Sequence, residues 1–259
     1  ADGGRGDGGR ADDAAFDWDV PPRELGLEGW RVRVGSADVV FPLGGRHYLA
    51  DALAAWAIAR EAGVGDAAAR EALAAAKPLA GRGELFRGPV TLYRDSYNAN
   101  PDSMREALAF CDALPWKGRK VYVLGEMREL GAASEAAHRA VLSALAKGGA
   151  DRVFLYGDAW GVGSREWGVG GSAAEREGRD TAIGGTARLE GGAACSHHAA
   201  TPYSLLPTPY TTLDALRDAL DDYLRPGDFV LLKGSRACAL EEVCSISALK
   251  DLIVNGGDS

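Results

Sequence analysis

The stretch PVTLYRDSYNANPDSMREALAFCDAL, residues 89–114, places a strand, a polar loop and a helix in direct succession. Residues 89–95 are apolar or β-branched at most positions, a pattern typical of a buried strand. Pro101 stands where a helix can begin, because its fixed φ suits the first turn and that turn does not need its N–H. The loop in between is crowded with aspartate, serine and asparagine, which either cap the helix and shape the turn or bind a ligand.

Strands and helices continue to alternate after this stretch. Further strands are predicted at 120–126, 151–158 and 228–234. Helices are predicted at 101–114, at 134–149 with Ser134 as its cap, at 212–224 and at 238–250. Near-continuous apolar strands between helices indicate an α/β fold in which a mainly parallel sheet is covered on both faces. In such sheets ligands bind where the strands end and the helices begin.

The sequence before residue 80 has a different pattern. WRVRVGSADVVFPL (30–43) alternates apolar residues with arginines ahead of Gly35-Ser36, which predicts a β-hairpin with its turn at that pair. Two alanine-rich helices are predicted to follow, one within 44–64 with Gly63 as its C-terminal stop and one within 65–79 that is ended by Lys77-Pro78.

Two segments lack the pattern of a packed element. Residues 1–27 begin with a run of Gly, Asp and Arg, and we expect them to form a disordered or loop segment. The stretch from about 160 to 210 is aperiodic and rich in Gly, Ala, Ser and Arg, and we expect it to be an inserted mobile loop.

The composition is that of a soluble globular protein. Of the 259 residues, 46% are hydrophobic and 25% are charged, and the formal net charge is -8. This charge argues against a general nucleic-acid or anionic-membrane binder, because such proteins carry basic surfaces. No apolar run reaches membrane-spanning length. The four cysteines have no CxxC or framework spacing, so we expect reduced thiols and a cytoplasmic protein.

The loops after the predicted strands carry the candidate site residues. Asp95 can accept hydrogen bonds from sugar hydroxyls, while Asn98 and Asn100 offer both donors and acceptors. Lys233 and Arg236 precede a predicted helix, whose N-terminus would add to their attraction for an anion. Each group also has an ordinary role, as a cap, a turn former or a solvated helix start. Since no Walker-type loop is present, the residues alone indicate an α/β domain for an anionic or nucleotide-like ligand.

Several segments, in order along the chain, resemble the Mur ligase family. DSYNANPDSMREAL is similar to the signature of the members that add D-alanyl-D-alanine to UDP-N-acetylmuramoyl-tripeptide. Further similar segments are FPLGGRHYLADALAAWAIAREAGV, LAGRGELF, VLGEMRELGAASEAAHRAV and VLLKGSRACALEEV. The resemblance covers about residues 28–158 and 212–245.

The resemblance implies a domain organisation. Mur ligases have a UDP-substrate domain, a central ATPase domain and a C-terminal Rossmann-like domain. Residues 28–80 would then end the central ATP-binding domain, and residues 81–259 would form the C-terminal domain with its mainly parallel sheet. The family's P-loop and magnesium ligands are not found in this sequence, so we expect it to be the C-terminal portion of a longer ligase. A stand-alone nucleotide- or partner-binding module, or a sibling acid–amino-acid ligase, is the alternative.

The resemblance also implies an activity in peptidoglycan precursor synthesis. Such ligases use ATP and Mg²⁺ to convert a substrate carboxylate into an acyl phosphate, which the incoming amine attacks. The expected partners are UDP-N-acetylmuramoyl-tripeptide and D-alanyl-D-alanine, with no nucleic acid, and the expected state is a monomer. We expect the Mg²⁺ ligands to lie outside this chain and the chain on its own not to catalyse ligation.

Roles for individual residues follow from the same resemblance. It implies catalytic roles for Asn98, Asn100 and Lys233. It implies contacts with ATP for His47, Arg82, Asp95 and Tyr97, and contacts with the dipeptide for Ser235 and Arg236. The sequence departs from the family pattern at Tyr48 and Asp51, where asparagines are expected, at Arg94, and at Glu126, where the family has aspartate.

Overall fold

The computed structural model describes residues 20–161 and 209–255. The chain divides into two compact units between Lys77 and Pro78. Most of the predicted tail and of the predicted inserted loop lies outside the described residues.

The smaller unit combines an antiparallel sheet with two helices. Its strands β1 (Arg23–Glu24), β2 (Trp30–Val34) and β3 (Ala37–Phe41) lie in that order. The predicted hairpin is therefore confirmed, and Gly35 adopts a φ of 62° in its turn. The prediction of a loop up to residue 27 is wrong at β1, because this strand pairs with β2.

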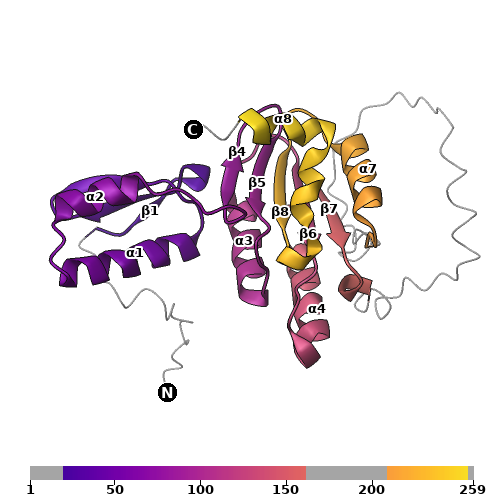
Figure 1. The fold of residues 1–259 in the computed structure, drawn as a ribbon, viewed down its shortest axis with the longest axis horizontal. Helices are drawn as coiled ribbons and strands as arrows, with labels where there is room; N and C mark the ends of the chain where they lie inside the picture. The colour runs from indigo at the N-terminus through magenta and orange to yellow at the C-terminus, as the bar shows by residue number, and fades with distance from the viewer. Residues whose placement is uncertain (1–19, 162–208, 256–259) are drawn as a thin grey trace, which may run out of the picture. The chain divides into compact units, whose positions relative to one another are not determined.

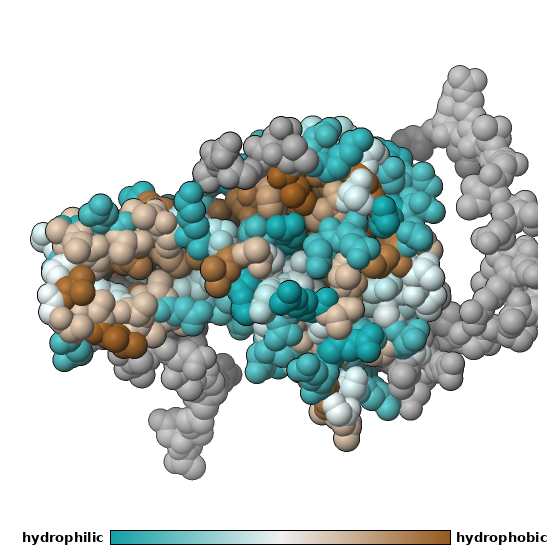
Figure 2. Space-filling view, viewed as in Figure 1, coloured by the Kyte–Doolittle hydropathy of each residue, from teal (hydrophilic) through white to brown (hydrophobic). Residues whose placement is uncertain are grey.

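The core of this unit comes from one face of the hairpin and from its helices α1 (Arg46–Glu61) and α2 (Asp66–Ala74). Its buried side chains are Trp30, Val32, Val34, Phe41, Ala52, Leu53, Ala69 and Leu73. Alanine dominates the outer faces of both helices, and Figure 2 shows the resulting weakly apolar surface over α1 and α2.

The larger unit contains a sheet of five strands with the order β4-β5-β8-β6-β7 (Figure 1). The strands are β4 (Glu84–Phe86), β5 (Thr91–Asp95), β6 (Lys120–Gly125), β7 (Arg152–Tyr156) and β8 (Phe229–Lys233). All of them run parallel except β4, which pairs antiparallel with β5 at one edge. The predicted mainly parallel sheet is thus confirmed, and the short strand β4 was not predicted.

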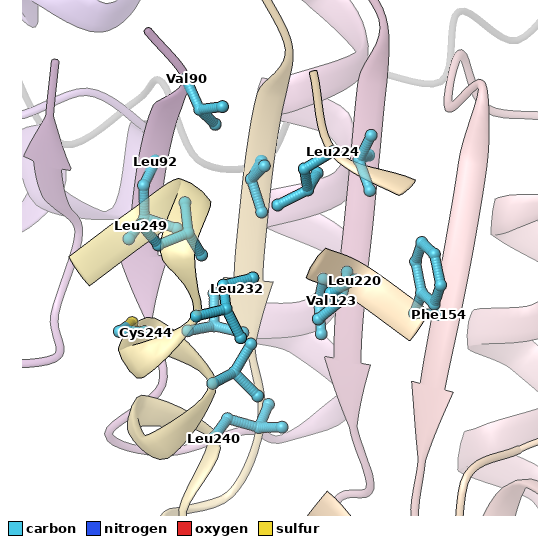
Figure 3. Close-up of a cluster of buried hydrophobic side chains, with 14 of the residues drawn as sticks. Val90, Leu92, Val123, Phe154, Leu220, Leu224, Leu232, Leu240, Cys244 and Leu249 are labelled. Atoms are coloured by element: carbon cyan, nitrogen blue, oxygen red, sulfur yellow. The ribbon is translucent and has the colours of Figure 1, made fainter. Parts of the chain in front are cut away.

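Helices cover both faces of this sheet. They are α3 (Pro101–Ala113), α4 (Ser134–Leu145), α7 (Leu213–Tyr223) and α8 (Ser247–Asn255). Figure 3 shows one face, where Leu92 on β5 lies beside Leu249 on α8 and Val123 on β6 lies beside Leu220 on α7. On the other face α3 packs against β5, with the rings of Phe110 and Tyr93 5.5 Å apart. Because alternate residues of a strand face opposite sides, continuous apolar strands fill both layers.

Two predictions about helices are wrong. The predicted helix 238–250 is replaced by the 3-10 turns Arg236–Cys238 and Leu240–Ser245, followed by α8. Ala239 between the turns has a φ of 47°, a left-handed conformation that interrupts a right-handed helix. Ser134 does not cap α4, because the 3-10 turn Gly131–Ala133 runs directly into the helix and already accepts the Ser134 N–H at Gly131.

No helix in the described ranges is both long enough and apolar enough to cross a membrane.

Candidate functional site

The polar loops that were singled out in the sequence meet at one edge of the larger unit's sheet. Strands β5, β8, β6 and β7 are mutually parallel, so their carboxyl ends lie together. The register pairs Lys233 with Asp95 on one side and with Leu124 on the other. The loops that carry the candidate residues therefore share one edge of the sheet.

A buried ion pair lies at the centre of this edge. The Lys233 ammonium donates to Asp95 Oδ2 at 2.6 Å and to the Asn98 carbonyl oxygen at 3.2 Å. Lys233 is only 1% exposed. Its charge therefore holds the end of β5 and the following loop. The α-helix that was predicted to begin just after Lys233 is replaced by the 3-10 turn Arg236–Cys238.

Tyr97 lies beside this ion pair but is exposed, and two arginines contact its ring. The guanidinium carbon of Arg82 is 4.1 Å from the ring centroid, and that of Arg236 is 5.3 Å away. The backbone N–H of Tyr97 donates to the carbonyl of Gly81 at 2.9 Å, which brings Arg82 next to the ring. In the part of the chain that the structure describes, neither guanidinium forms an ion pair. This arginine–tyrosine cluster (Arg82, Tyr97, Arg236) thus offers positive charge to an anion.

The two asparagines of the loop use their side-chain oxygens locally. Asn100 caps α3: its Oδ1 accepts from the backbone N–H of Ser103 at 2.8 Å, and the Ser103 hydroxyl accepts from the Asn100 N–H at 3.1 Å. Asn98 Oδ1 accepts from the backbone N–H of Ala99 at 2.9 Å. Both side chains are exposed, so their amide NH₂ groups are the parts available to a ligand.

Ser235 joins the loop after β8 to the loop after β6. Its hydroxyl oxygen accepts from the backbone N–H of Arg128 at 2.9 Å, and its own N–H donates to the Glu126 carbonyl at 3.3 Å. Ser235 is buried, and Arg236 follows it on the surface. The position of Arg236 near Tyr97 therefore depends on how the β6 loop is held.

Glu126 links the β6 loop to the segment after β7. Its buried carboxylate forms an ion pair with Arg128 and accepts from the backbone N–H of Ala159 at 3.0 Å. Gly157 has a φ of 112°, and a Cβ there would lie 2.6 Å from the Glu126 carboxyl carbon. The close approach of these two loops thus requires glycine at residue 157.

Residues 81–236 match the family model described as Mur ligase, glutamate ligase domain. The chain belongs to the Mur ligase family. The match covers the whole arginine–tyrosine cluster and the strands that position it.

Curated relatives in this Mur ligase family are named UDP-N-acetylmuramoyl-tripeptide–D-alanyl-D-alanine ligase. The relative from Treponema pallidum (strain Nichols) is 33% identical over 223 residues, which are 84% of this chain and 40% of the relative. The relative from Escherichia coli (strain K12) is 41% identical over 148 residues, which are 55% of this chain and 31% of the relative. The chain therefore spans less than half the length of these curated Mur ligases.

Solved Mur ligase structures share the fold. A crystal structure of MurF from Acinetobacter baumannii gives a TM-score of 0.64 at 23% identity, covering 91% of this chain and 44% of that one. MurF from Thermotoga maritima in complex with ADP gives a TM-score of 0.59 at 20% identity, covering 84% and 42%. The predicted Mur ligase C-terminal fold is confirmed by these similarities.

The structure brings most of the residues implied by the Mur ligase resemblance to one edge of the sheet. They are Arg82, Asp95, Tyr97, Asn98, Asn100, Lys233, Ser235 and Arg236. His47 belongs to the smaller unit, where it is half-buried at the start of α1 with its ring 4.0 Å from that of Tyr48. In the described ranges no group of three His, Cys, Asp or Glu side chains is placed to hold a metal ion.

One residue of this Mur ligase edge was not predicted to have a role. His138 on α4 is 1% exposed, and its ring nitrogens bond to the β6 loop and to its own helix. The structure shows that this side chain is packed in the interior. A lone histidine on an otherwise apolar helix face was the one sign in the sequence that this residue has a polar partner. The partner is the backbone N–H of Met127, which a pattern of side chains cannot reveal.

Proposed function

We propose that the chain forms part of a ligase that uses ATP to join D-alanyl-D-alanine to UDP-N-acetylmuramoyl-tripeptide in peptidoglycan precursor synthesis. The names of the curated relatives support this reaction, and family membership supports the ligase class. The observation that carries the proposal is the contact of Arg82 and Arg236 with one exposed tyrosine at the carboxyl edge of the sheet.

The arginine–tyrosine cluster fits the charges of this reaction. Its guanidiniums each present several N–H donors in a fixed plane, which suits phosphate and carboxylate oxygens. We assign Arg82 to ATP phosphates, and Arg236 with the Ser235 hydroxyl to the dipeptide carboxylate. Bound ATP supplies the phosphoryl group that activates the tripeptide carboxylate, and this chain's residues orient the reactants and neutralise charge.

The remaining residues of the edge have narrower roles in the proposal. Asp95 Oδ2 is bonded to the Lys233 ammonium, so we assign a hydrogen bond from a ribose hydroxyl to the other carboxylate oxygen of Asp95. We propose that Tyr97, Asn98 and Asn100 line the space where the reactants meet. We propose that Lys233 contributes by fixing this loop. We assign Mg²⁺ to residues outside the described part.

The test is ligation by the complete product of the gene that encodes this chain. We expect phosphate release and a product of the expected mass only when ATP, UDP-N-acetylmuramoyl-tripeptide and D-alanyl-D-alanine are all present. L-Alanyl-L-alanine serves as the matched control substrate. The 259-residue chain alone is expected to show no turnover, and gel filtration is expected to show a monomer.

Two outcomes would contradict the proposal. Ligation of a different amino acid in place of the dipeptide would identify a sibling acid–amino-acid ligase. Nucleotide binding without turnover by the complete product, with every substrate present, would identify a binding module.

A further inference from the structure

One side chain of the neighbouring helix α4 bonds to the backbone of the loop after β6. His138 Nε2 accepts a hydrogen bond from the backbone N–H of Met127 at 3.0 Å. Met127 is itself 2% exposed, so its N–H has no water to bond if this acceptor is removed. The loop also contains Glu129 with a φ of 64°, a conformation that side-chain-bearing residues adopt only when the surroundings impose it.

The other ring nitrogen fixes the protonation state. His138 Nδ1 lies 2.7 Å from the carbonyl oxygen of Ser134, an acceptor, so Nδ1 must carry a proton. Nε2 accepts from Met127 and must be unprotonated. The network therefore assigns a neutral imidazole with its proton on Nδ1.

Aromatic packing fixes the plane of the same ring. The rings of His138 and Trp160 meet edge to face with centroids 4.6 Å apart. Trp160 is fully buried, and its indole N–H donates to the Tyr156 carbonyl at 3.1 Å, at the end of β7. The imidazole is thus held by α4 on one side and by the segment after β7 on the other.

A continuous path leads from this ring to the arginine–tyrosine cluster. The residue after Met127 is Arg128, whose backbone N–H donates to the Ser235 hydroxyl at 2.9 Å. Ser235 is followed directly by Arg236, which contacts the Tyr97 ring. A shift of the β6 loop would therefore be transmitted to one of the two guanidiniums.

We propose that His138 is a positioning residue: its neutral Nδ1–H imidazole holds the Met127 N–H, and through Arg128 and Ser235 it keeps Arg236 against Tyr97. The kinetic part of this inference rests on the proposed function, whereas the structural part does not. His138 does not touch the cluster itself. A purely space-filling histidine would pack equally well in either tautomer or as a phenyl ring.

Two substitutions separate the hydrogen bond from the packing. His138→Phe keeps a ring against Trp160 but leaves the Met127 N–H without an acceptor. His138→Gln loses the ring but carries a carbonyl oxygen that can reach the Nε2 position and accept from Met127. Tyr122→Phe is the matched control, because it removes another buried hydrogen bond, from the Tyr122 hydroxyl to Asp112 Oδ1 at 2.7 Å, nearer the start of β6.

The structural measurement uses NMR on the 259-residue chain. Long-range ¹⁵N spectra of the His138 ring are expected to show the neutral Nδ1–H form at neutral pH. Exchange of the Arg128 amide with solvent is expected to be faster by at least about tenfold in His138→Phe than in His138→Gln or Tyr122→Phe. An Nε2–H tautomer, a charged ring at neutral pH, or equal Arg128 exchange in all variants would overturn the proposal.

The kinetic measurement uses the complete gene product at a temperature where every variant is folded. We expect His138→Phe to raise the KM for D-alanyl-D-alanine about tenfold, and His138→Gln and Tyr122→Phe to change it by less than about twofold. Equal KM values in His138→Phe and Tyr122→Phe would mean that His138 only packs in the core and does not position Arg236. If the wild type ligates nothing, the proposed function fails, while the NMR result still decides whether His138 holds the loop.

Discussion

Lys233 and Asp95 are partners in register on two parallel strands, and the 2.6 Å contact between Nζ and Oδ2 is buried at the sheet edge that carries the candidate site. Their side chains are 2% and 11% exposed, respectively. The resemblance to Mur ligases implies a catalytic lysine here, whereas the geometry shows an ammonium that is already paired. Stability measurements can separate these roles, because a buried charge that loses its partner is costly.

We predict that Lys233→Met and Asp95→Asn each lower the free energy of unfolding by about 3–5 kcal/mol, and that the double variant loses less than the sum. Urea unfolding of the 259-residue chain measures both effects. Arg105→Ala is the control, since it breaks an exposed ion pair with Asp102 and is expected to cost less than about 1 kcal/mol. A Lys233→Met variant as stable as the wild type would show that the ion pair does not hold this edge.

We predict the opposite behaviour for the two exposed arginines. Arg82→Ala and Arg236→Ala are expected to change the free energy of unfolding by less than about 0.5 kcal/mol, because both side chains are exposed. In the complete protein each is expected to raise the KM for its ligand at least about tenfold, ATP for Arg82 and the dipeptide for Arg236. Arg105→Ala again serves as the control. Unchanged KM values in both Arg82→Ala and Arg236→Ala would show that the arginine–tyrosine cluster does not bind the substrates.

Asn100 requires a test that keeps the helix cap intact. Asn100→Ala is expected to cost about 1 kcal/mol of stability, because the Ser103 N–H loses its acceptor. Asn100→Ser retains a capping oxygen but lacks the amide NH₂. If Asn100 is catalytic, Asn100→Ser lowers kcat while leaving thermal unfolding nearly unchanged. Full activity of Asn100→Ser would make this asparagine a cap alone.

The pH dependence of stability follows from His138. Burial lowers the pKa of its imidazole below the ordinary 6.5, outweighing the opposing effects of the hydrogen bond to Ser134 and of the negative charge of Glu126. The unfolded chain therefore takes up this proton first as pH falls. The contribution of neutral His138 to the free energy of unfolding is complete above about pH 6.5. It is lost as the pH drops toward the lowered pKa of His138 in the folded chain.

The corresponding prediction compares two proteins between about pH 7 and pH 5. The free energy of unfolding of the wild type is expected to fall more steeply than that of His138→Gln, which has no imidazole to titrate. Urea titrations at a series of pH values give the two slopes. Parallel slopes would mean that His138 has the same pKa in the folded and unfolded chain.

The sequence was sufficient to predict the parallel strands, because apolar runs such as KVYVLG are long and regular. It was not sufficient for β4, whose three residues are too few to show a period. The helix predicted at 238–250 failed because Ala239 has a φ of 47°, a left-handed conformation that interrupts the helix near its predicted start. Leu240, Val243 and Cys244 have helical spacing, so the sequence pattern gave no sign of this interruption.

The site was predicted as a set of loops but not as a set of contacts. The sequence motifs place Asp95 and Lys233 at the ends of strands. They become partners because β5 and β8 are neighbours in the sheet. The same holds for Arg236, which reaches Tyr97 because β8 lies next to β5. Such long-range pairings depend on the whole topology, which a local pattern does not contain.

Strand β8 is the last strand among the residues that the structure describes, yet it lies between β5 and β6. During synthesis on the ribosome, β4 can pair with β5 and β6 with β7 as they emerge, but the two halves have no common neighbour until Phe229–Lys233 appears. The inner edges of β5 and β6 stay unpaired during that interval, and such edges are prone to join other chains. Any truncation before Phe229 would therefore leave two separate strand pairs in place of one sheet, so assembly of this unit has to wait until β8 has been translated.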